Sequence, residues 1–362
     1  MKNKCIFKFC SFVLSCLTIL CTFVVLDRKE YVYADNVTNG SSEIVMEVNS
    51  LRVLTSKNSD AKKYMASTTK ILTALVVIEH CNMSDIITVT KDTIGVEGSS
   101  IYLEEGEKLS VKDLLYGLML RSGNDCAETL AKHCAGSIEN FAVLMNETAK
   151  NCGAINSNFT NPHGLHDDNH YTTAYDLALI SCHAMKNPTF REIVSTKFID
   201  IPFTTRNYNR HLVNKNKMLT EFEGSTGIKT GYTKKAGRCL VSSCVRNGME
   251  LVCVVLSCPP MFERSKELLA TAFDEYEQYK IIEADNIVGF IKSVETNENC
   301  ALHVKNDVII PLNVNEYNSL EIVYDYPKTL ENLPKNDTEI GFVKIYCQNN
   351  LIFQEKIYTI LG

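Results

Sequence analysis

Apolar residues along this chain follow two different patterns. In the middle, from about 67 to 195, they recur at helical spacing over long stretches, as in Val111 to Leu120. On either side the apolar runs are shorter and are separated by turn residues, which is typical of strands. A helical region with strands before and after it predicts one antiparallel sheet, built from both ends of the domain, with helices packed on it.

Two turn signals set the expected strand pairs. Asn247-Gly248 is a strong two-residue hairpin signal, and Asn49-Ser50 joins two shorter runs. The expected strands are 43–48, 52–56, 225–232, 238–245 and 250–257, and the expected helices are 67–82, 111–120, 125 onward, 141–152, 172–185 and 262–279. The predicted fold class is therefore mixed α/β (α+β), with an antiparallel sheet and a helical insertion.

The pattern changes again near residue 283. Short apolar runs alternate with turns up to the end of the chain, and we find no cluster of catalytic side chains among them. The expected strands are 287–294, 301–304, 308–312, 320–324, 339–347 and 351–360. We predict three parts: a signal peptide at 1–34, a catalytic domain at 35–282 and a C-terminal all-β domain at 283–362.

The N-terminus is typical of an export signal. Three lysines precede an uncharged and mostly apolar run from Phe9 to Leu26, and Val32-Tyr33-Ala34 places small residues at the −3 and −1 positions of a cleavage site. We expect cleavage after Ala34. The alternative is an uncleaved membrane anchor, because a run of this length is at the lower limit for spanning a bilayer. In both cases the body of the protein is expected outside the cytoplasm, in the cell envelope or secreted.

Charge excludes one class of partner. The formal net charge is −6, and residues 1–34 carry a net +3, so the remainder is strongly acidic at −9. An acidic body without a basic stripe argues against nucleic acid as a partner. The 45% hydrophobic and 22% charged residues are those of an ordinary globular protein with a sizeable core.

Cysteine usage is unusual for an exported protein. Of 15 cysteines, 11 lie beyond the signal segment, and none of these forms a Cys-x-x-Cys pair. Cys239, Cys244 and Cys253 sit inside apolar strand-like runs. We interpret them as buried free thiols that act as small apolar residues, rather than as disulfides or zinc ligands.

The first candidate for chemistry is Ser67-x-x-Lys70, at the start of an apolar helix. Residues three apart share a helix face, so the Lys70 amine can reach the Ser67 hydroxyl. A serine needs an adjacent base to become a nucleophile, and a lysine is a base only if burial or a second cation lowers its pKa. Alone, the pattern is weak evidence for catalysis, because it is more often that of an N-cap serine with a solvated lysine.

A second polar motif, Ser122-x-Asn124, falls on a tight loop between two expected helices. Ser122 could relay a proton to a leaving amine. Asn124 could hold the lysine or a substrate amide, although an asparagine that begins a helix is often only a cap.

The third motif, Lys229-Thr230-Gly231, lies on an expected strand. Lys229 adds positive charge, which lowers the pKa of a neighbouring lysine and attracts a carboxylate that Thr230 could hydrogen-bond. Gly231 leaves room for a substrate backbone, and the strand at Tyr232 could offer a backbone N–H to an oxyanion hole shared with Ser67.

These motifs resemble those of the low-molecular-mass penicillin-binding proteins, the serine D-alanyl-D-alanine carboxypeptidases of peptidase family S11. The likeness covers roughly 43–280 and rests on Ala66 to Lys70, Gly117 to Asp125, Asn161 to Leu165 and Gly227 to Thr233. It implies a penicillin-binding-protein/β-lactamase-like transpeptidase fold followed by a β-rich domain. It also implies a peptidoglycan stem pentapeptide as substrate, loss of its terminal D-alanine, inhibition by β-lactam antibiotics through a slow acyl-enzyme, and no metal or other cofactor.

Two features depart from the family pattern. Members commonly end in an amphipathic membrane helix, and this sequence stops at Leu361-Gly362 without one, so any peripheral membrane association is expected through the N-terminal segment only. Arg238 stands where an aromatic residue is expected. It could reach a substrate carboxylate or simply lie on a solvated strand face, and Tyr208 and Arg210 are weaker candidates for substrate contact.

Two other functions compete with the carboxypeptidase. A β-lactamase would need a glutamate to activate the deacylating water, and we find no Glu-x-x-x-Asn pattern between Asn124 and Lys229. A non-catalytic wall-binding protein would be favoured by loss of Ser67 or Lys70, and both are present. The histidines and aspartates from 163 to 170 fit no firm zinc spacing, and we interpret them as hydrogen-bonding loop residues.

Overall fold

The structure is a computed structural model that describes residues 40–360. The predicted signal peptide lies outside the described residues. The described residues all belong to one compact unit. Within 40–360, no helix has the length and apolar character needed to cross a membrane.

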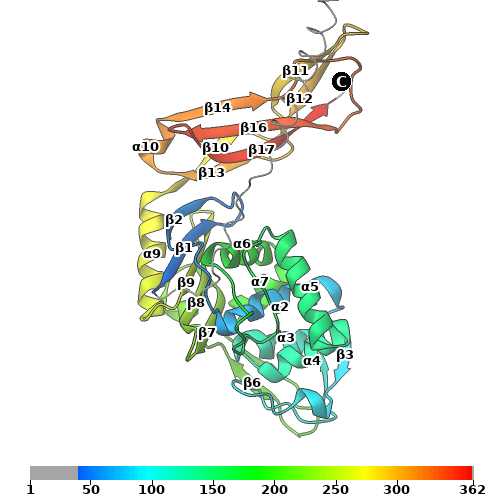
Figure 1. Cartoon of the computed structure of the whole chain (residues 1–362), viewed down its shortest axis with the longest axis vertical. Coiled ribbons are helices and arrows are strands. Elements are labelled where there is room, and N and C mark those ends of the chain that lie inside the picture. Colours follow the sequence, from blue (N-terminus) through cyan, green and yellow to red (C-terminus); the bar gives the residue numbers. More distant parts are fainter. Residues whose placement is uncertain (1–39, 361–362) are drawn as a thin grey trace, which may run out of the picture. The chain divides into compact units, whose positions relative to one another are not determined.

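A five-stranded antiparallel sheet organises the first part of the chain, in the order β2-β1-β9-β8-β7 (Figure 1). Its strands are β1 (Ser42–Glu47), β2 (Val53–Lys57), β7 (Ser225–Thr233), β8 (Gly237–Arg246) and β9 (Met249–Leu256). Every residue of β9 is buried, and all except Glu250 are apolar, as expected of a central strand with both faces covered. Because β1 pairs with β9, the sheet joins the two ends of the domain, as predicted.

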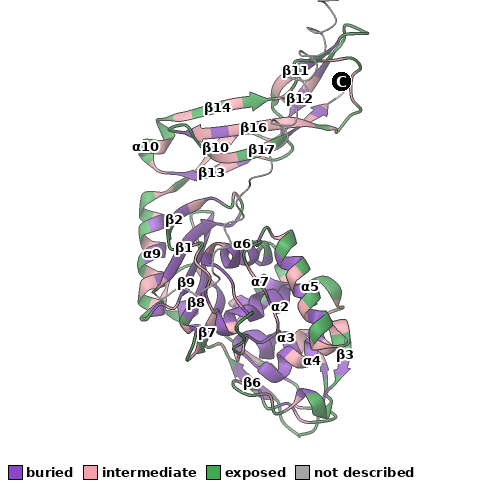
Figure 2. Cartoon of the chain, viewed as in Figure 1, coloured by how far each residue is buried: buried purple, intermediate pink, exposed green. Residues whose placement is uncertain are grey.

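Helices cover both faces of this sheet. The helices are α2 (Lys70–His80), α3 (Val111–Leu120), α4 (Asn124–Ala135), α5 (Ile138–Asn151), α6 (Ala174–Met185), α7 (Pro188–Ser195), α8 (Met218–Glu221) and α9 (Met261–Glu275). Helix α6 contacts β1 and β9 on one face, whereas α9 contacts β8 and β9 on the other (Figure 1). Helix α2 lies within the helical layer, and its first eight residues are buried (Figure 2).

Local sequence explains where α3 begins. The Ser110 side chain accepts a hydrogen bond from the Asp113 backbone N–H, and the Asp113 carboxylate accepts from the Ser110 N–H, which is a capping box. The helix ends at Leu120, directly before the second polar motif. The predicted helix at 111–120 is therefore confirmed at both ends.

Two predictions around the sheet are wrong. The closing helix ends at Glu275 rather than at Tyr279, because Glu277–Ile282 extends as β10 and pairs with β13 (Val308–Leu312). The sequence analysis also missed a short hairpin, β5 (Phe198–Ile201) with β6 (Arg210–Val213). Both are cases in which tertiary pairing decides the conformation of a short segment that has little periodicity of its own. The other short elements here are η1 (Ala66–Thr69), β3 (Ile86–Thr88), η2 (Lys91–Thr93) and β4 (Lys108–Ser110).

The C-terminal part is built on strands, as predicted. Besides β10 and β13 these are β11 (Ile287–Ser293), β12 (Asn299–His303), β14 (Leu320–Asp325), β15 (Thr329–Leu330), β16 (Glu339–Cys347) and β17 (Asn350–Ile360), with one short helix α10 (Val314–Tyr317). Six of these strands form a sheet in the order β14-β16-β17-β12-β11-β15. The predicted boundaries at 34 and 282 stay predictions.

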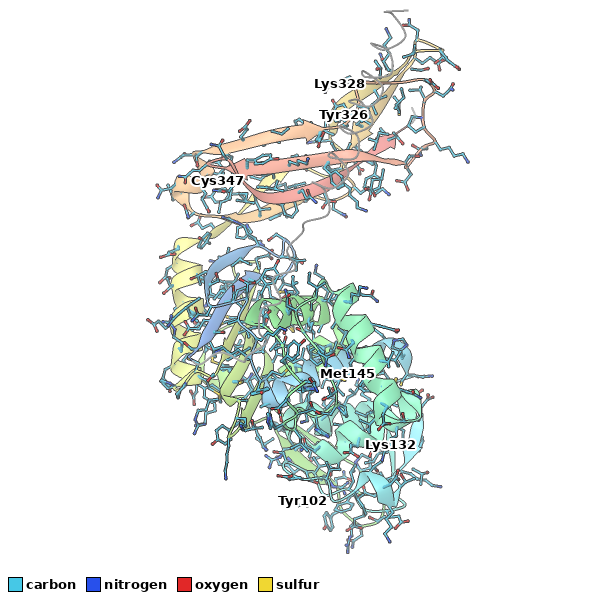
Figure 3. The ribbon with its side chains drawn as sticks, in the orientation of Figure 1. Tyr102, Lys132, Met145, Tyr326, Lys328 and Cys347 are labelled. Carbon is cyan, nitrogen blue, oxygen red and sulfur yellow. The ribbon has the colours of Figure 1, made fainter. Side chains whose placement is uncertain are left out.

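Tyr326 accounts for two glycines of this sheet. A Cβ on Gly289 would overlap the Tyr326 hydroxyl, and a Cβ on Gly341 would lie 2.8 Å from the Tyr326 Cβ. The Lys328 ammonium lies 3.9 Å from the centroid of the same ring, and both side chains are labelled in Figure 3. The Tyr326 ring therefore packs over β11 at Gly289, and the Tyr326 Cβ lies over β16 at Gly341, where side chains are absent.

Candidate active site

Ser67 lies on a tight turn directly before α2. Residues Ala66–Thr69 form a 3-10 helix, and the α-helix itself begins only at Lys70. Ala66 has φ +48°, in the left-handed region that L-residues rarely adopt. The Thr69 hydroxyl donates to the Ala66 carbonyl at 2.8 Å and so closes the turn that carries Ser67.

Lys70 is fully buried, and its amine contacts three oxygens. Lys70 Nζ lies 3.2 Å from Ser67 Oγ, 2.7 Å from Asn124 Oδ1 and 2.6 Å from the backbone carbonyl of His163. Burial lowers the pKa of Lys70 well below its ordinary value, and the Lys229 cation lowers it further. The contact predicted from the spacing of Ser67 and Lys70 is present, with a second and third partner for the amine.

Asn124 holds the lysine through its side chain. Its amide oxygen accepts from Lys70, while its amide NH2 donates to the Glu97 carbonyl. Its backbone N–H donates to the Ser99 carbonyl at 2.7 Å. A Cβ on Gly98 would lie 2.8 Å from Asn124 Nδ2, so the 97–99 segment fits closely over this amide. Asn124 is therefore not a helix cap: Gly123 is the N-cap of α4, and the Asn124 side chain binds Lys70 instead.

Ser122 sits on the turn between α3 and α4. It is 4% exposed and has φ +65°, an uncommon conformation for a serine. Asp125, three residues after Ser122, anchors the 100–103 loop. Its carboxylate accepts hydrogen bonds from the Ser100 hydroxyl and from the backbone N–H groups of Ile101 and Leu103. The α3–α4 turn is thus fixed from the loop side as well as by its own helices.

Strand β7 carries the third motif alongside the Ser67 turn. Lys229 is 2% exposed, and burial together with the nearby Lys215 cation lowers its pKa to about 7. A Cβ on Gly231 would lie 3.1 Å from the Ser67 backbone nitrogen, so a side chain at this position would push the strand away from the Ser67 turn. Thr230 is half-buried, and Tyr232 is exposed at the end of the strand.

Arg238 and Arg210 have different surroundings. The Arg238 guanidinium lies 5.7 Å from the centroid of the Tyr232 ring, its partner in the β7–β8 register. Arg210 is buried and forms an ion pair with the Glu107 carboxylate, and it also donates to the Tyr102 carbonyl. Arg210 therefore ties β6 to the 102–107 loop, and its charge is already neutralised.

The histidine-rich loop supports the site without forming a metal centre. In the described part of the chain, 40–360, no group of three or more His, Cys, Asp or Glu side chains is arranged to hold a metal ion. His163 Nδ1 accepts from the Leu165 N–H at 3.1 Å, and the Asp167 carboxylate accepts from the Asn169 N–H. His163 and Asp167 thus make the kind of local hydrogen bonds that the sequence analysis expected of this loop.

The structure thus joins Ser67, Lys70 and Asn124 by direct contacts, and places Ser122 and the β7 motif on the adjoining turn and strand. Sequence reasoning missed the main-chain oxygens of His163 and Glu97. Main-chain acceptors have no signature of their own, although the Asn161 to Leu165 segment that carries one of them was part of the recognised pattern.

Two family models match the sequence. The peptidase S11 model, described as D-alanyl-D-alanine carboxypeptidase, matches residues 30–259, and the model of the penicillin-binding protein 5 C-terminal domain matches residues 276–360. Among solved structures, penicillin-binding protein 5 from Haemophilus influenzae superposes with a TM-score of 0.76 at 28% identity, over 90% of this chain and 98% of that one. The fold class predicted from the sequence is confirmed.

Curated relatives agree with the family models. D-alanyl-D-alanine carboxypeptidase DacF of Bacillus subtilis is 33% identical over 259 residues, which is 69% of this chain and 66% of that protein. DacA of Haemophilus influenzae is 35% identical over 255 residues, 67% of this chain and 63% of the relative. The matched segment thus spans slightly less than two thirds of either relative. From the family model and these identities, the chain belongs to the peptidase S11 family of D-alanyl-D-alanine carboxypeptidases.

Proposed function

We propose that this protein is a serine D-alanyl-D-alanine carboxypeptidase that removes the terminal D-alanine from peptidoglycan stem pentapeptides through an acyl-enzyme on Ser67. One observation carries the proposal: a fully buried lysine amine lies 3.2 Å from the hydroxyl of a serine on a strained turn. Burial lowers the pKa of this amine and so favours its neutral form, which is the form that can act as a base toward Ser67.

The contacts of Lys70 also orient its lone pair. A neutral amine has two N–H bonds and one lone pair. Asn124 Oδ1 at 2.7 Å and the His163 carbonyl at 2.6 Å accept the two N–H bonds. The lone pair is then left for the third contact, the Ser67 hydroxyl, whose proton it accepts as the serine oxygen attacks.

The remaining residues take the roles that their positions allow. The attacked carbonyl is that of the penultimate D-alanine, and its developing negative charge would be stabilised by the backbone N–H groups of Ser67 and Tyr232. Ser122 returns a proton to the departing D-alanine amine. Lys229 and Thr230 bind the terminal carboxylate, and Gly231 leaves room for the substrate backbone beside β7. Water then cleaves the ester, which restores the Ser67 hydroxyl and releases the shortened peptide.

The same site accounts for penicillin as an inhibitor, since a β-lactam carries a carboxylate and a reactive amide and lacks a leaving group that diffuses away. We further propose that the N-terminal segment exports the protein, that trimming of cross-linking donors affects cell shape, and that this segment mediates any membrane association. These three points rest on the sequence pattern and on the extracytoplasmic substrate of the family.

The test uses the purified chain without its predicted signal. The protein is incubated with a fluorescent penicillin and, in parallel, with a peptide ending in Lys-D-Ala-D-Ala, and the readouts are intact-protein mass and free D-alanine. We expect a persistent adduct on Ser67 and release of D-alanine, both absent in Ser67→Ala.

Other outcomes point elsewhere. Rapid penicillin turnover without a lasting adduct or D-alanine release would indicate a β-lactamase, and silence in both assays would indicate a wall-binding protein. Full D-alanine release by Ser67→Ala would refute the mechanism.

A further inference from the structure

His170 is a buried side chain that the proposed mechanism does not use, yet it contacts the turn that carries the nucleophile. It is 3% exposed, and its Nε2 lies 2.8 Å from the hydroxyl of Thr69. Its Nδ1 accepts a hydrogen bond from the Thr160 backbone N–H at 3.0 Å. The Phe159 ring packs edge-on against the imidazole, with the ring centroids 5.7 Å apart.

These contacts determine which nitrogen of the neutral His170 imidazole carries the proton. The Thr160 N–H is a donor only, so Nδ1 must be the unprotonated nitrogen, and in the neutral ring the proton sits on Nε2. Nε2–H therefore donates to Thr69 Oγ1, and the Thr69 hydroxyl in turn donates to the Ala66 carbonyl. Burial lowers the pKa of His170 to about 3, and the neighbouring His163 and Lys70 act in the same direction, so the neutral ring persists at working pH.

The hydrogen-bond chain ends at the residue whose backbone is strained. Ala66 immediately precedes Ser67, and its φ of +48° costs free energy that the surroundings must offset. Without a donor from His170, the Thr69 hydroxyl could rotate away from the Ala66 carbonyl. The turn would then relax, and Ser67 Oγ would move relative to Lys70 Nζ.

We propose that His170 is a positioning residue for Ser67: a fixed N–H donor that acts through Thr69 to hold the strained Ala66–Ser67 turn in the reactive geometry. This proposal rests on the proposed function of Ser67. The proposal distinguishes the two ring nitrogens. Only the Nε2–H group is connected, through Thr69 and Ala66, to Ser67, whereas Nδ1 accepts from Thr160.

Two substitutions separate these two nitrogens. In His170→Gln, the amide NH2 takes the place of Nε2–H and can still donate to Thr69, while the Thr160 N–H loses its acceptor. In His170→Asn, the amide oxygen takes the place of Nδ1 and still accepts from Thr160, while the shorter side chain cannot reach Thr69. Each variant leaves one polar group unpaired, so both are expected to lose a similar amount of stability.

The measurement is the rate of acylation by fluorescent penicillin as a function of its concentration, on protein shown by urea unfolding to be folded. We expect His170→Asn to lower the limiting rate by about 10- to 100-fold, because a small displacement of a nucleophile costs rate steeply. The half-saturating concentration should change little, since the carboxylate-binding strand is not touched. His170→Gln should stay within about threefold of the wild type, given the same reasoning.

A second pair of variants, at Thr69, tests the proposal if a His170 variant does not fold. Thr69→Val removes the hydroxyl while keeping the shape, and Thr69→Ser keeps the hydroxyl; we expect a slow Thr69→Val and a fast Thr69→Ser. Equal acylation rates within both pairs would overturn the proposal, as would losses that only follow stability. If the wild type itself is not acylated, the proposed function fails. Hydrogen exchange of the peptide 65–70, faster in His170→Asn than in His170→Gln, then reports on the turn alone, and equal exchange would refute its positioning.

Discussion

Replacing Gly164 with alanine tests how closely the Ser67 turn depends on the loop packed against it. Gly164 has φ +83°, and a Cβ built on it would overlap the Ala66 carbonyl oxygen and lie 2.8 Å from Thr69 Oγ1. An alanine in the left-handed region costs about 1–2 kcal/mol. Forcing a methyl group into a packed backbone contact adds about 1–3 kcal/mol. The expected loss in the free energy of unfolding is therefore about 2–5 kcal/mol.

Gly153→Ala is the matched control. Gly153 has nearly the same φ, +85°, but the nearest atom to its Cβ is Leu179 Cδ1 at 3.5 Å, an ordinary contact. It should show only the cost of the left-handed conformation, about 1–2 kcal/mol. The difference between the two variants in urea unfolding then measures the overlap at Ala66.

Activity distinguishes the two glycines more sharply than stability. Relief of the overlap at Gly164 must move the Ala66 carbonyl, and a shift near 1 Å of the following serine would slow acylation by about 100-fold. Gly153→Ala should be acylated by penicillin at the wild-type rate. If Gly164→Ala loses no more stability than Gly153→Ala and is acylated normally, the close fit of this loop to the nucleophile turn is not a constraint on the site.

Two further predictions concern charge. The acylation rate should rise with pH as Lys70 loses its proton, and Lys229→Met should move this rise to higher pH, because the Lys229 cation lowers the Lys70 pKa; an unchanged midpoint in a pH–rate profile would contradict that coupling. Glu107→Gln should cost about 3–5 kcal/mol in urea unfolding, because it leaves the buried Arg210 charge without its partner. Lys266→Met, which breaks an exposed ion pair, is the control and should cost far less.

Sequence patterns were sufficient to predict the helices and strands wherever hydrophobic periodicity and turn residues indicated the same element. Helix α3 was predicted with both of its ends, and β7, β8 and β9 were each predicted to within a residue or two at both ends, because Asn247-Gly248 fixes the register of the last hairpin. The spacing of Ser67 and Lys70 predicted that the amine can reach the hydroxyl, and the structure shows this contact.

What the sequence could not reveal depends on segments that meet only in the folded chain. Strand β10 looked like the end of α9, because its partner β13 lies some thirty residues further along. Asn124 could have bound lysine or substrate, and only the carbonyl of Glu97, which takes the amide NH2, settles which end faces Lys70. From the sequence, His170 was only one of several loop histidines. Its role became visible only in the structure, where its two ring nitrogens contact Thr69 and Thr160.

The two buried amines of this site work against folding, and this is the physical cost of the lysine base that we propose. For both Lys70 and Lys229 the pKa in the folded state is lowered, so the unfolded chain binds more protons over the interval up to the ordinary value near 10.5. Stability from these groups therefore rises with pH across that interval and is lowest where both would be charged. Elsewhere the domain offsets this with an extensive buried core, of which α2 is a central part. The helix that carries Lys70 is thus also one of the most deeply packed. Its burial lowers the Lys70 pKa and stabilises α2, whereas a proton on the buried amine opposes folding.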